Sequence, residues 1–154
     1  YWYRQASTFG GECKRSVDHF KENLLVHRQE QYLYGDRNAQ YMLGRIYETG
    51  AGGVFPNIDE AIRWYEDAAV RGDTASQAKL AVLYGIMGKP RMDKQLGYAW
   101  AKVADGSATN EKMKKPYETL KTVISPAEES MGDTTFQQLS ALIAYNLKDL
   151  NLAP

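Results

Sequence analysis

Residues 39–72 read AQYMLGRIYETGAGGVFPNIDEAIRWYEDAAVRG, and residues 76–106 read SQAKLAVLYGIMGKPRMDKQLGYAWAKVADG. The two stretches share their order of small, aromatic and aliphatic residues at a nearly constant distance. Such self-similarity is the mark of an internal repeat. A spacing of 37 residues relates Leu43 to Leu80 and Tyr47 to Tyr84, and one of 36 residues relates Trp64 to Trp100 and Ala68 to Ala104.

Each repeat is predicted to form two helices. Ala39, Leu43, Ile46 and Tyr47 follow the spacing of one helical face, and no stretch shows the alternation of a strand. Gly50 ends the first helix, since glycine readily adopts the left-handed conformation of a helix end. The sequence therefore indicates an all-α fold. We expect helix pairs at residues 38–49 with 58–71 and at 75–86 with 93–105, flanked by a helix near 16–34 and a C-terminal helix ending near 150.

Two local signals predict where other helices begin. Asn57 stands three residues before Glu60, the spacing of a capping box. Ser125, Pro126 and Glu128 supply a cap, a first-turn proline and a capping-box glutamate for the last helix. That helix carries an apolar stripe, which suits the closing element of a repeat stack. The stripe consists of Phe136, Leu139, Ile143, Leu147 and Leu150.

The first repeat resembles the Sel-one-like repeat (SLR) family, the longer relatives of tetratricopeptide repeats. The second repeat departs from the family pattern at Ala81, which replaces a glycine, and at Asp105, which replaces an alanine. The resemblance implies an α/α superhelix (solenoid) of helix-turn-helix repeats with a C-terminal capping helix. It divides a single domain into a degenerate repeat over 1–37, repeats over 38–73 and 74–109, and capping helices over 110–154. The resemblance rests on Ala39, Leu43, Gly44, Tyr47, Gly50, Ala61, Trp64, Tyr65, Ala68, Ala69 and Gly72.

Composition excludes several classes of protein. The 154 residues include 19 Lys and Arg and 19 Asp and Glu, a formal net charge of zero. Nucleic-acid binding as the main purpose is excluded, because it needs a surplus of basic residues. No apolar run approaches the roughly 20 residues of a membrane span. Because the chain begins with Tyr1 rather than Met, we expect a mature protein after signal cleavage, periplasmic or secreted, or else a trimmed cytoplasmic one.

Few residues are candidates for catalysis, metal binding or phosphate binding. Cys13, His19 and His27 are an incomplete set for zinc, and no base is placed beside the cysteine. The glycines of residues 50–53 lack the Lys of a phosphate-binding loop and are explained by an inter-helix turn. We therefore predict no catalytic residue, no metal and no cofactor. The basic residues Lys112, Lys114, Lys115 and Lys121 are interpreted as a solvated face.

Function is therefore expected to lie on a surface. By the resemblance, the first helix of each repeat lines a concave groove that binds a partner protein or peptide. Tyr41 also fits an alternative role in packing between helices. A structural part of a bacterial envelope, flagellar-motor or secretion assembly is the second hypothesis, and a hydrolase is disfavoured because no nucleophile and base are paired. The predicted binding residues are Gln40, Tyr41, Arg45, Glu48 and Gln77.

Overall fold

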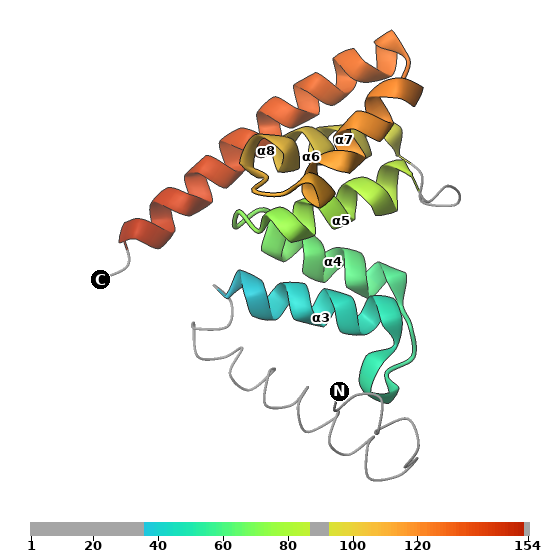
Figure 1. The fold of residues 1–154 in the computed structure, drawn as a ribbon. Coiled ribbons are helices and arrows are strands. Elements are labelled where there is room, and N and C mark those ends of the chain that lie inside the picture. The colour runs from blue at the N-terminus through green and yellow to red at the C-terminus, as the bar shows by residue number, and fades with distance from the viewer. Residues whose placement is uncertain (1–35, 87–92, 153–154) are drawn as a thin grey trace. The chain divides into compact units, whose positions relative to one another are not determined.

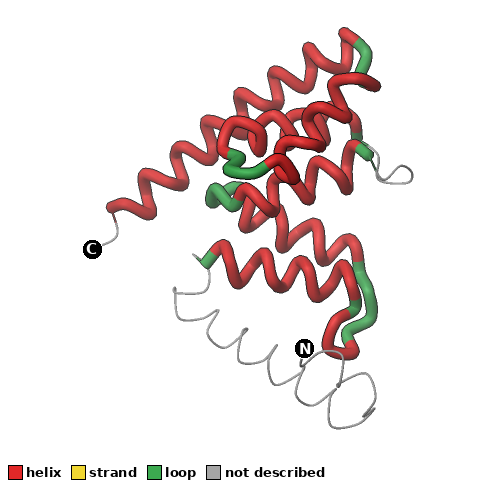
Figure 2. The backbone as a smooth tube through the Cα atoms, viewed as in Figure 1, coloured by secondary structure: helices red, strands yellow, loops and turns green. Residues whose placement is uncertain are grey.

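The computed structural model describes residues 36–86 and 93–152, and within these ranges it holds six α-helices and no strand (Figures 1 and 2). The all-α fold is thereby confirmed. The chain divides into two compact units, one up to Trp64 and one from Tyr65, so the division falls inside helix α4. The expected helix over residues 16–34 lies outside the described residues, and so do Cys13, His19 and His27.

Helix α3 (Arg37–Thr49) opens the described part of the first unit. Its N-cap is Asp36, whose carboxylate accepts hydrogen bonds from the backbone N–H groups of Asn38 and Ala39 at 2.9 and 3.3 Å. Gly50 ends the helix in the left-handed conformation, with φ of 71°. Both ends therefore lie within one residue of the predicted bounds.

A tight turn connects α3 to α4 (Ile58–Ala69) through a short 3-10 helix, η1 (Ala51–Gly53). A Cβ atom on Gly50 would lie 2.8 Å from the Cγ of Pro56, so the turn is packed against its own glycine. Asn57 caps α4 as predicted, because its side-chain oxygen accepts hydrogen bonds from the backbone N–H groups of Asp59 and Glu60 at 3.1 and 3.2 Å. The capping box is incomplete, because the N–H of Asn57 donates to the carbonyl of Tyr47 at 2.8 Å.

The second unit begins in α4 and continues into α5 (Thr74–Gly85). A helix-ending glycine and a helix-capping aspartate stand between the two helices. Gly72 adopts a φ of 86°, which ends the preceding helix. Asp73 then caps α5, and its carboxylate accepts from the Ser76 N–H at 2.7 Å. The sequence left Asp73 and Thr74 open as the cap, and the structure selects Asp73.

We predict that Asp73→Ala lowers the free energy of unfolding by about 0.5–2 kcal/mol, because an N–H at the start of α5 loses its acceptor. Urea unfolding followed by circular dichroism measures the loss. Asp67→Ala is the control, since Asp67 is an exposed aspartate within α4 that caps nothing. Equal stability of the two variants would contradict the prediction.

Helix α6 (Lys94–Ser107) packs closely on α5 through two glycines. A Cβ atom on Gly97 would lie 2.5 Å from the Cα and N atoms of Gly85. The family pattern places its close-approach glycine where this repeat has Ala81. The two helices instead approach each other through Gly85, one turn later on α5, which accommodates the departure at Ala81.

Helix α7 (Glu111–Val123) begins where a third repeat would begin, although sequence similarity ends after Gly106. The caps of α3, α5 and α7 are Asp36, Asp73 and Asn110, each 37 residues after the last. Pro116 lies inside α7 and is buried, so the proline removes one backbone donor without ending the helix. The 37-residue spacing of helix starts therefore continues to α7, although the residue pattern of the repeats ends after Gly106.

Helix α8 (Pro126–Leu152) covers α6 and ends near the predicted residue 150. Its capping box is complete: the Ser125 N–H donates to Glu128 at 2.9 Å, and the Glu128 N–H donates to the Ser125 hydroxyl at 3.4 Å. The Glu128 carboxylate also accepts a hydrogen bond from the Ser125 hydroxyl at 2.8 Å. The bonds from the backbone N–H and the hydroxyl of Ser125 lower the pKa of Glu128, and the backbone bond contributes more. Figure 1 shows α8 running along α6 and beyond it.

Polar and aromatic side chains fasten α8 to α6. The Lys102 ammonium lies 2.7 Å from the Asp133 carboxylate and 5.0 Å from the centre of the Phe136 ring. The Tyr98 hydroxyl donates to Glu129 at 3.2 Å. These contacts supplement the predicted apolar stripe, in which Ile143 is buried, Phe136 and Leu139 are half-buried and Leu147 is exposed.

Two further contacts fix the position of α8 along the second unit. Gly132 faces Tyr98, and a Cβ atom there would lie 2.7 Å from the tyrosine ring. The Asn146 side-chain amide donates to the Val70 carbonyl at 2.9 Å. The helix therefore reaches from α6 to the turn before α5, as a capping element does.

Candidate functional site

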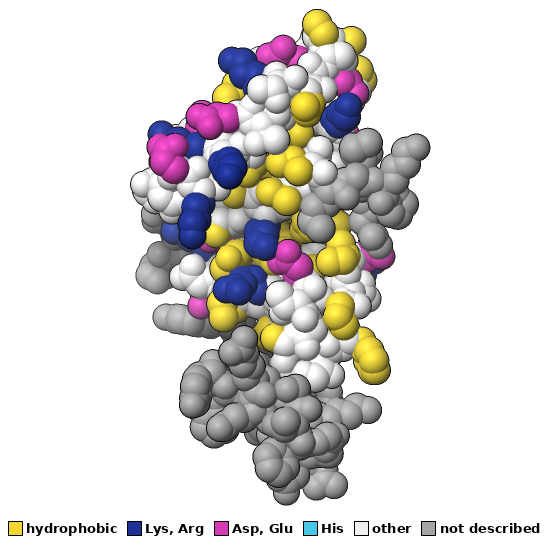
Figure 3. Space-filling model, turned by 45° about the vertical axis from the view of Figure 1, so that its right-hand side comes forward, with side chains coloured by type: hydrophobic (Ala, Val, Ile, Leu, Met, Phe, Trp, Pro, Cys, Tyr) yellow, Lys and Arg dark blue, Asp and Glu magenta, His cyan; other side chains and the backbone are white. Residues whose placement is uncertain are grey.

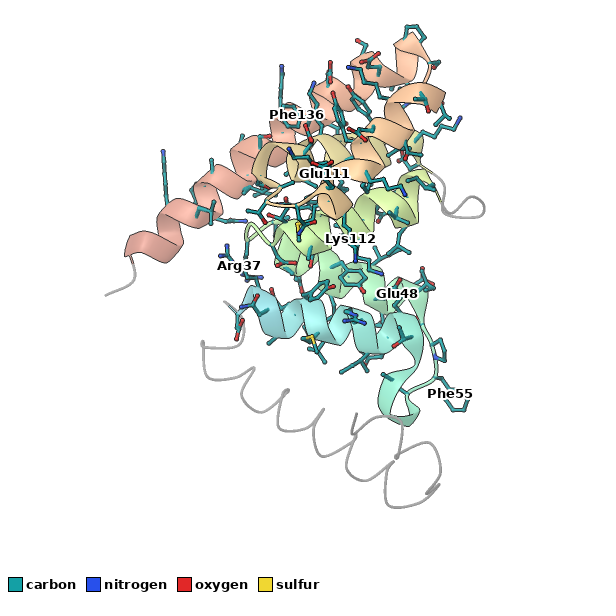
Figure 4. The ribbon with its side chains drawn as sticks, in the orientation of Figure 1. Arg37, Glu48, Phe55, Glu111, Lys112 and Phe136 are labelled. Carbon is teal, nitrogen blue, oxygen red and sulfur yellow. The ribbon has the colours of Figure 1, made fainter. Side chains whose placement is uncertain are left out.

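Three of the four predicted binding residues of α3 lie on one side of the helix, namely Tyr41, Arg45 and Glu48. Arg45 is exposed, and Tyr41 and Glu48 are half-buried (Figure 4 labels Glu48). They are three or four residues apart, which places their side chains beside one another. Leu43 and Ile46 are buried on the other side. Helix α3 therefore has a packing side and an accessible side, and Gln40 does not lie on the accessible side.

Gln40 and Gln77 occupy equivalent positions, 37 residues apart, and both are buried, at 3% and 1% exposure. The Gln77 amide N–H donates to the Ala69 carbonyl at 3.0 Å, and its oxygen accepts from the Ser107 hydroxyl at 3.3 Å. Gln77 thus joins the end of α4 to the end of α6. Neither glutamine presents its side chain to solvent. The Gln77 side chain is hydrogen-bonded at both its nitrogen and its oxygen, as buried polar groups generally are.

The second unit has an accessible surface of its own on α5 and α7, which pack against each other. Ala78, Lys79 and Val82 of α5 are half-buried, whereas Leu80 and Leu83 are buried. On α7, Lys112, Lys115 and Thr119 are exposed (Figure 4 labels Lys112). Lys112 and Lys115 belong to the basic residues that are interpreted from the sequence as a solvated face.

Tyr98 is a buried ionisable residue of the second unit. Burial raises the pKa of Tyr98 well above its usual range, and the hydrogen bond and proximity of Tyr117 raise it further, followed by the charges of Asp133 and Glu129. Tyr98 therefore remains neutral and acts as a hydrogen-bond donor.

Among the described residues no cluster of His, Cys, Asp and Glu could hold a metal ion. The helices in these ranges also include none that is long and apolar enough to cross a membrane.

Two of the helix pairs match a known family of repeats. The Sel1 repeat model matches residues 37–73 and 74–104, which contain α3 with α4 and α5 with most of α6. These segments are Sel1 repeats. Sel1 repeats generally serve as protein–protein interaction modules and are typically not catalytic. A search of curated proteins finds no match for the sequence.

A solved structure supports the same fold. It is the crystal structure of a protective antigen present in uropathogenic Escherichia coli strains, which displays an SLR fold. The two chains are 20% identical, with a TM-score of 0.65 over 99% of this chain. The match covers 35% of the antigen, so this chain spans about a third of that protein. The SLR superhelix predicted from the Sel1 repeats is the fold of this chain.

Proposed function

We propose that this chain is an interaction module that binds a partner protein or peptide through the first helices of its Sel1 repeats. The observation that carries the proposal is the division of α3. Its buried side holds Leu43, Gly44 and Ile46, whereas its accessible side carries Tyr41 and Arg45. Tyrosine and arginine are enriched among the residues that dominate binding energy, because they combine large contact area with directional polar groups.

The burial of Gln40 and Gln77 reduces the proposed contact set to Tyr41, Arg45 and Glu48. Gln77 acts in the scaffold through its bonds to Ala69 and Ser107. The remaining residues form an aromatic, cationic and anionic group on one helix side. Such a group binds a partner through ring contact together with charge-assisted hydrogen bonds.

We predict that Tyr41→Ala with Arg45→Ala abolishes partner binding, with a loss of at least about 30-fold if one of them is a hot spot worth 2 kcal/mol. Partners captured from a lysate on the wild-type chain and identified by mass spectrometry provide the binding assay. The matched control is Tyr145→Ala with Lys148→Ala, because these residues are also an exposed aromatic and a cation on one side of a helix.

A measurement of stability distinguishes the two possible roles of Tyr41, which are partner binding and packing between helices. Arg45 is exposed, so its replacement is expected to change the free energy of unfolding by no more than about 0.5 kcal/mol. If Tyr41→Ala alone lowers the melting temperature as strongly as a core substitution, Tyr41 packs between helices and the proposed contact set is wrong. If the double variant folds and binds normally, the partner uses another surface.

A further inference from the structure

The outer side of helix α8 carries no charge over about four turns. Nine residues from Ser130 to Tyr145 are exposed, and all of them are Ser, Thr, Gln, Ala, Met, Leu or Tyr. The charged residue of this span, Asp133, pairs with Lys102 of α6 at 2.7 Å. Charged residues make up 25% of the chain, and Figure 3 shows them scattered over the face that it presents. Charged residues are depleted in this way at the centres of protein interfaces.

Large apolar side chains lie on this outer side. Met131 is 57% exposed, Leu142 44% and Tyr145 63%. The Met131 sulfur accepts a hydrogen bond from the Gln95 amide at 3.4 Å, which holds the side chain in place while more than half of it stays accessible. Figure 1 shows α8 at the edge of the second unit, with no described helix on the side away from α6.

Five exposed residues of this side are spaced symmetrically about Gln138. Thr134 and Leu142 are each four residues from it, and Met131 and Tyr145 are each seven residues from it. We call these five residues the outer row of α8. In a two-fold symmetric, antiparallel pair of helices, a residue before the axis lies level with the residue equally far after it in the other copy.

The outer row is therefore complementary to itself. With the axis at Gln138, Met131 of one copy lies level with Tyr145 of the other, and Thr134 lies level with Leu142. Contacts between a methionine sulfur and an aromatic ring are favourable. The two Gln138 amides meet at the axis, where each can donate to the other and accept from it.

A second copy also satisfies the requirements of charge and area. A partner that placed charged groups on the outer row would lose their hydration and gain no counter-charge, whereas another outer row is uncharged. Antiparallel helices also oppose their dipoles. The nine exposed side chains offer roughly 500 Å² per copy, so the pair buries about 1,000 Å², the lower limit of a specific interface.

We propose that this chain forms a weak antiparallel dimer in which the outer row of α8 packs on the outer row of a second copy. The inference goes beyond the proposed function, because it adds an interface on a different helix from α3. A dimer presents two α3 surfaces, so a partner with two binding sites is held more tightly by the dimer than by one chain.

Sedimentation equilibrium of the full chain, from roughly 1 µM to 1 mM, tests the proposal, because an interface of this size is expected to dissociate in the micromolar range. We expect a reversible change from the mass of one chain to that of two. Leu142→Glu with Tyr145→Glu is expected to weaken the dimer at least about tenfold, since it places charges in an uncharged contact.

The matched control for this charge insertion is Met42→Glu with Phe55→Glu. These residues are also exposed and apolar, at 50% and 91%, and belong to the first unit. The control is expected to leave the dimer constant within about twofold. Circular dichroism checks that both variants remain helical.

Cysteine cross-linking in a Cys13→Ser background tests the antiparallel register. Gln138→Cys is expected to form a disulfide with its own copy, because the residue lies at the axis. Met131→Cys is not, because the two copies of this residue lie about 21 Å apart along the helices. Mixing Met131→Cys chains with Tyr145→Cys chains is expected to restore the cross-link.

The outcomes separate this inference from the proposed function. A chain that stays monomeric at 1 mM, or a dimer that the Leu142 and Tyr145 variant does not weaken, overturns the inference. So does Met131→Cys that cross-links to itself, or a monomeric chain whose captured partner is lost with the Leu142 and Tyr145 variant. Tyr145→Ala with Lys148→Ala is expected to lose the dimer and keep the partner of α3, whereas Tyr41→Ala with Arg45→Ala does the reverse.

Discussion

Replacing Trp100 with alanine is expected to lower the free energy of unfolding by about 3–5 kcal/mol, the usual result of truncating a large core aromatic. Trp100 is 2% exposed and lies in α6, to which α5, α7 and α8 all contribute contacts. The space left by the indole would therefore open in the packed interior of the second unit. Denaturant unfolding at constant pH measures the loss.

Two variants sharpen the result for Trp100. Its indole N–H is buried without a hydrogen-bond partner among the described residues, so part of the packing energy is offset. Trp100→Phe removes that donor while keeping a ring, and it is expected to be much milder than alanine. Both tryptophans are expected from the sequence to be mostly buried, but Trp64 is partly exposed, so Trp64→Ala should cause the smaller loss of stability. A wild-type melting temperature for Trp100→Ala would refute the assigned repeat register.

Adding one methyl group at Gly97 is expected to be nearly as damaging, at about 3 kcal/mol. The new carbon would lie 2.5 Å from two backbone atoms of Gly85, so α5 and α6 must move apart. Gly106→Ala is the matched control in the same helix, because no atom lies within 4 Å of its Cβ position. That control should be neutral or stabilising, by up to about 1 kcal/mol, since alanine favours helix. If the two variants melt together, the close approach of α5 and α6 is not real.

Local signals allowed much of the fold to be predicted from the sequence. Caps such as Asp73 and Asn57 act within three residues of their acceptors, so their spacing is visible in a linear chain. The glycine at position 72 similarly ends a helix through its own backbone. The 37-residue spacing then transfers each assignment from one repeat to the next. The helix bounds and the Sel1 assignment are confirmed for this reason.

The candidate site was less predictable because exposure depends on elements distant in the sequence. Gln77 is polar and was expected at the surface, yet it bonds to Ala69 and to Ser107, which lies 30 residues away. The need for a glycine at position 97 likewise follows from Gly85, which belongs to another helix and lies against it.

The bond from Asn146 to the Val70 carbonyl spans 76 residues and has a consequence for the order in which the second unit folds. Contacts within a repeat can form as soon as both of its helices leave the ribosome. The docking of α8 must wait until residue 146 has been synthesised, and until then the Val70 carbonyl and the α6 surface face water. Loop closure over this length is slow relative to helix formation. In a repeat array, whose units otherwise depend on their neighbours alone, α8 couples two segments of the second unit that lie 76 residues apart and makes this unit unfold more cooperatively.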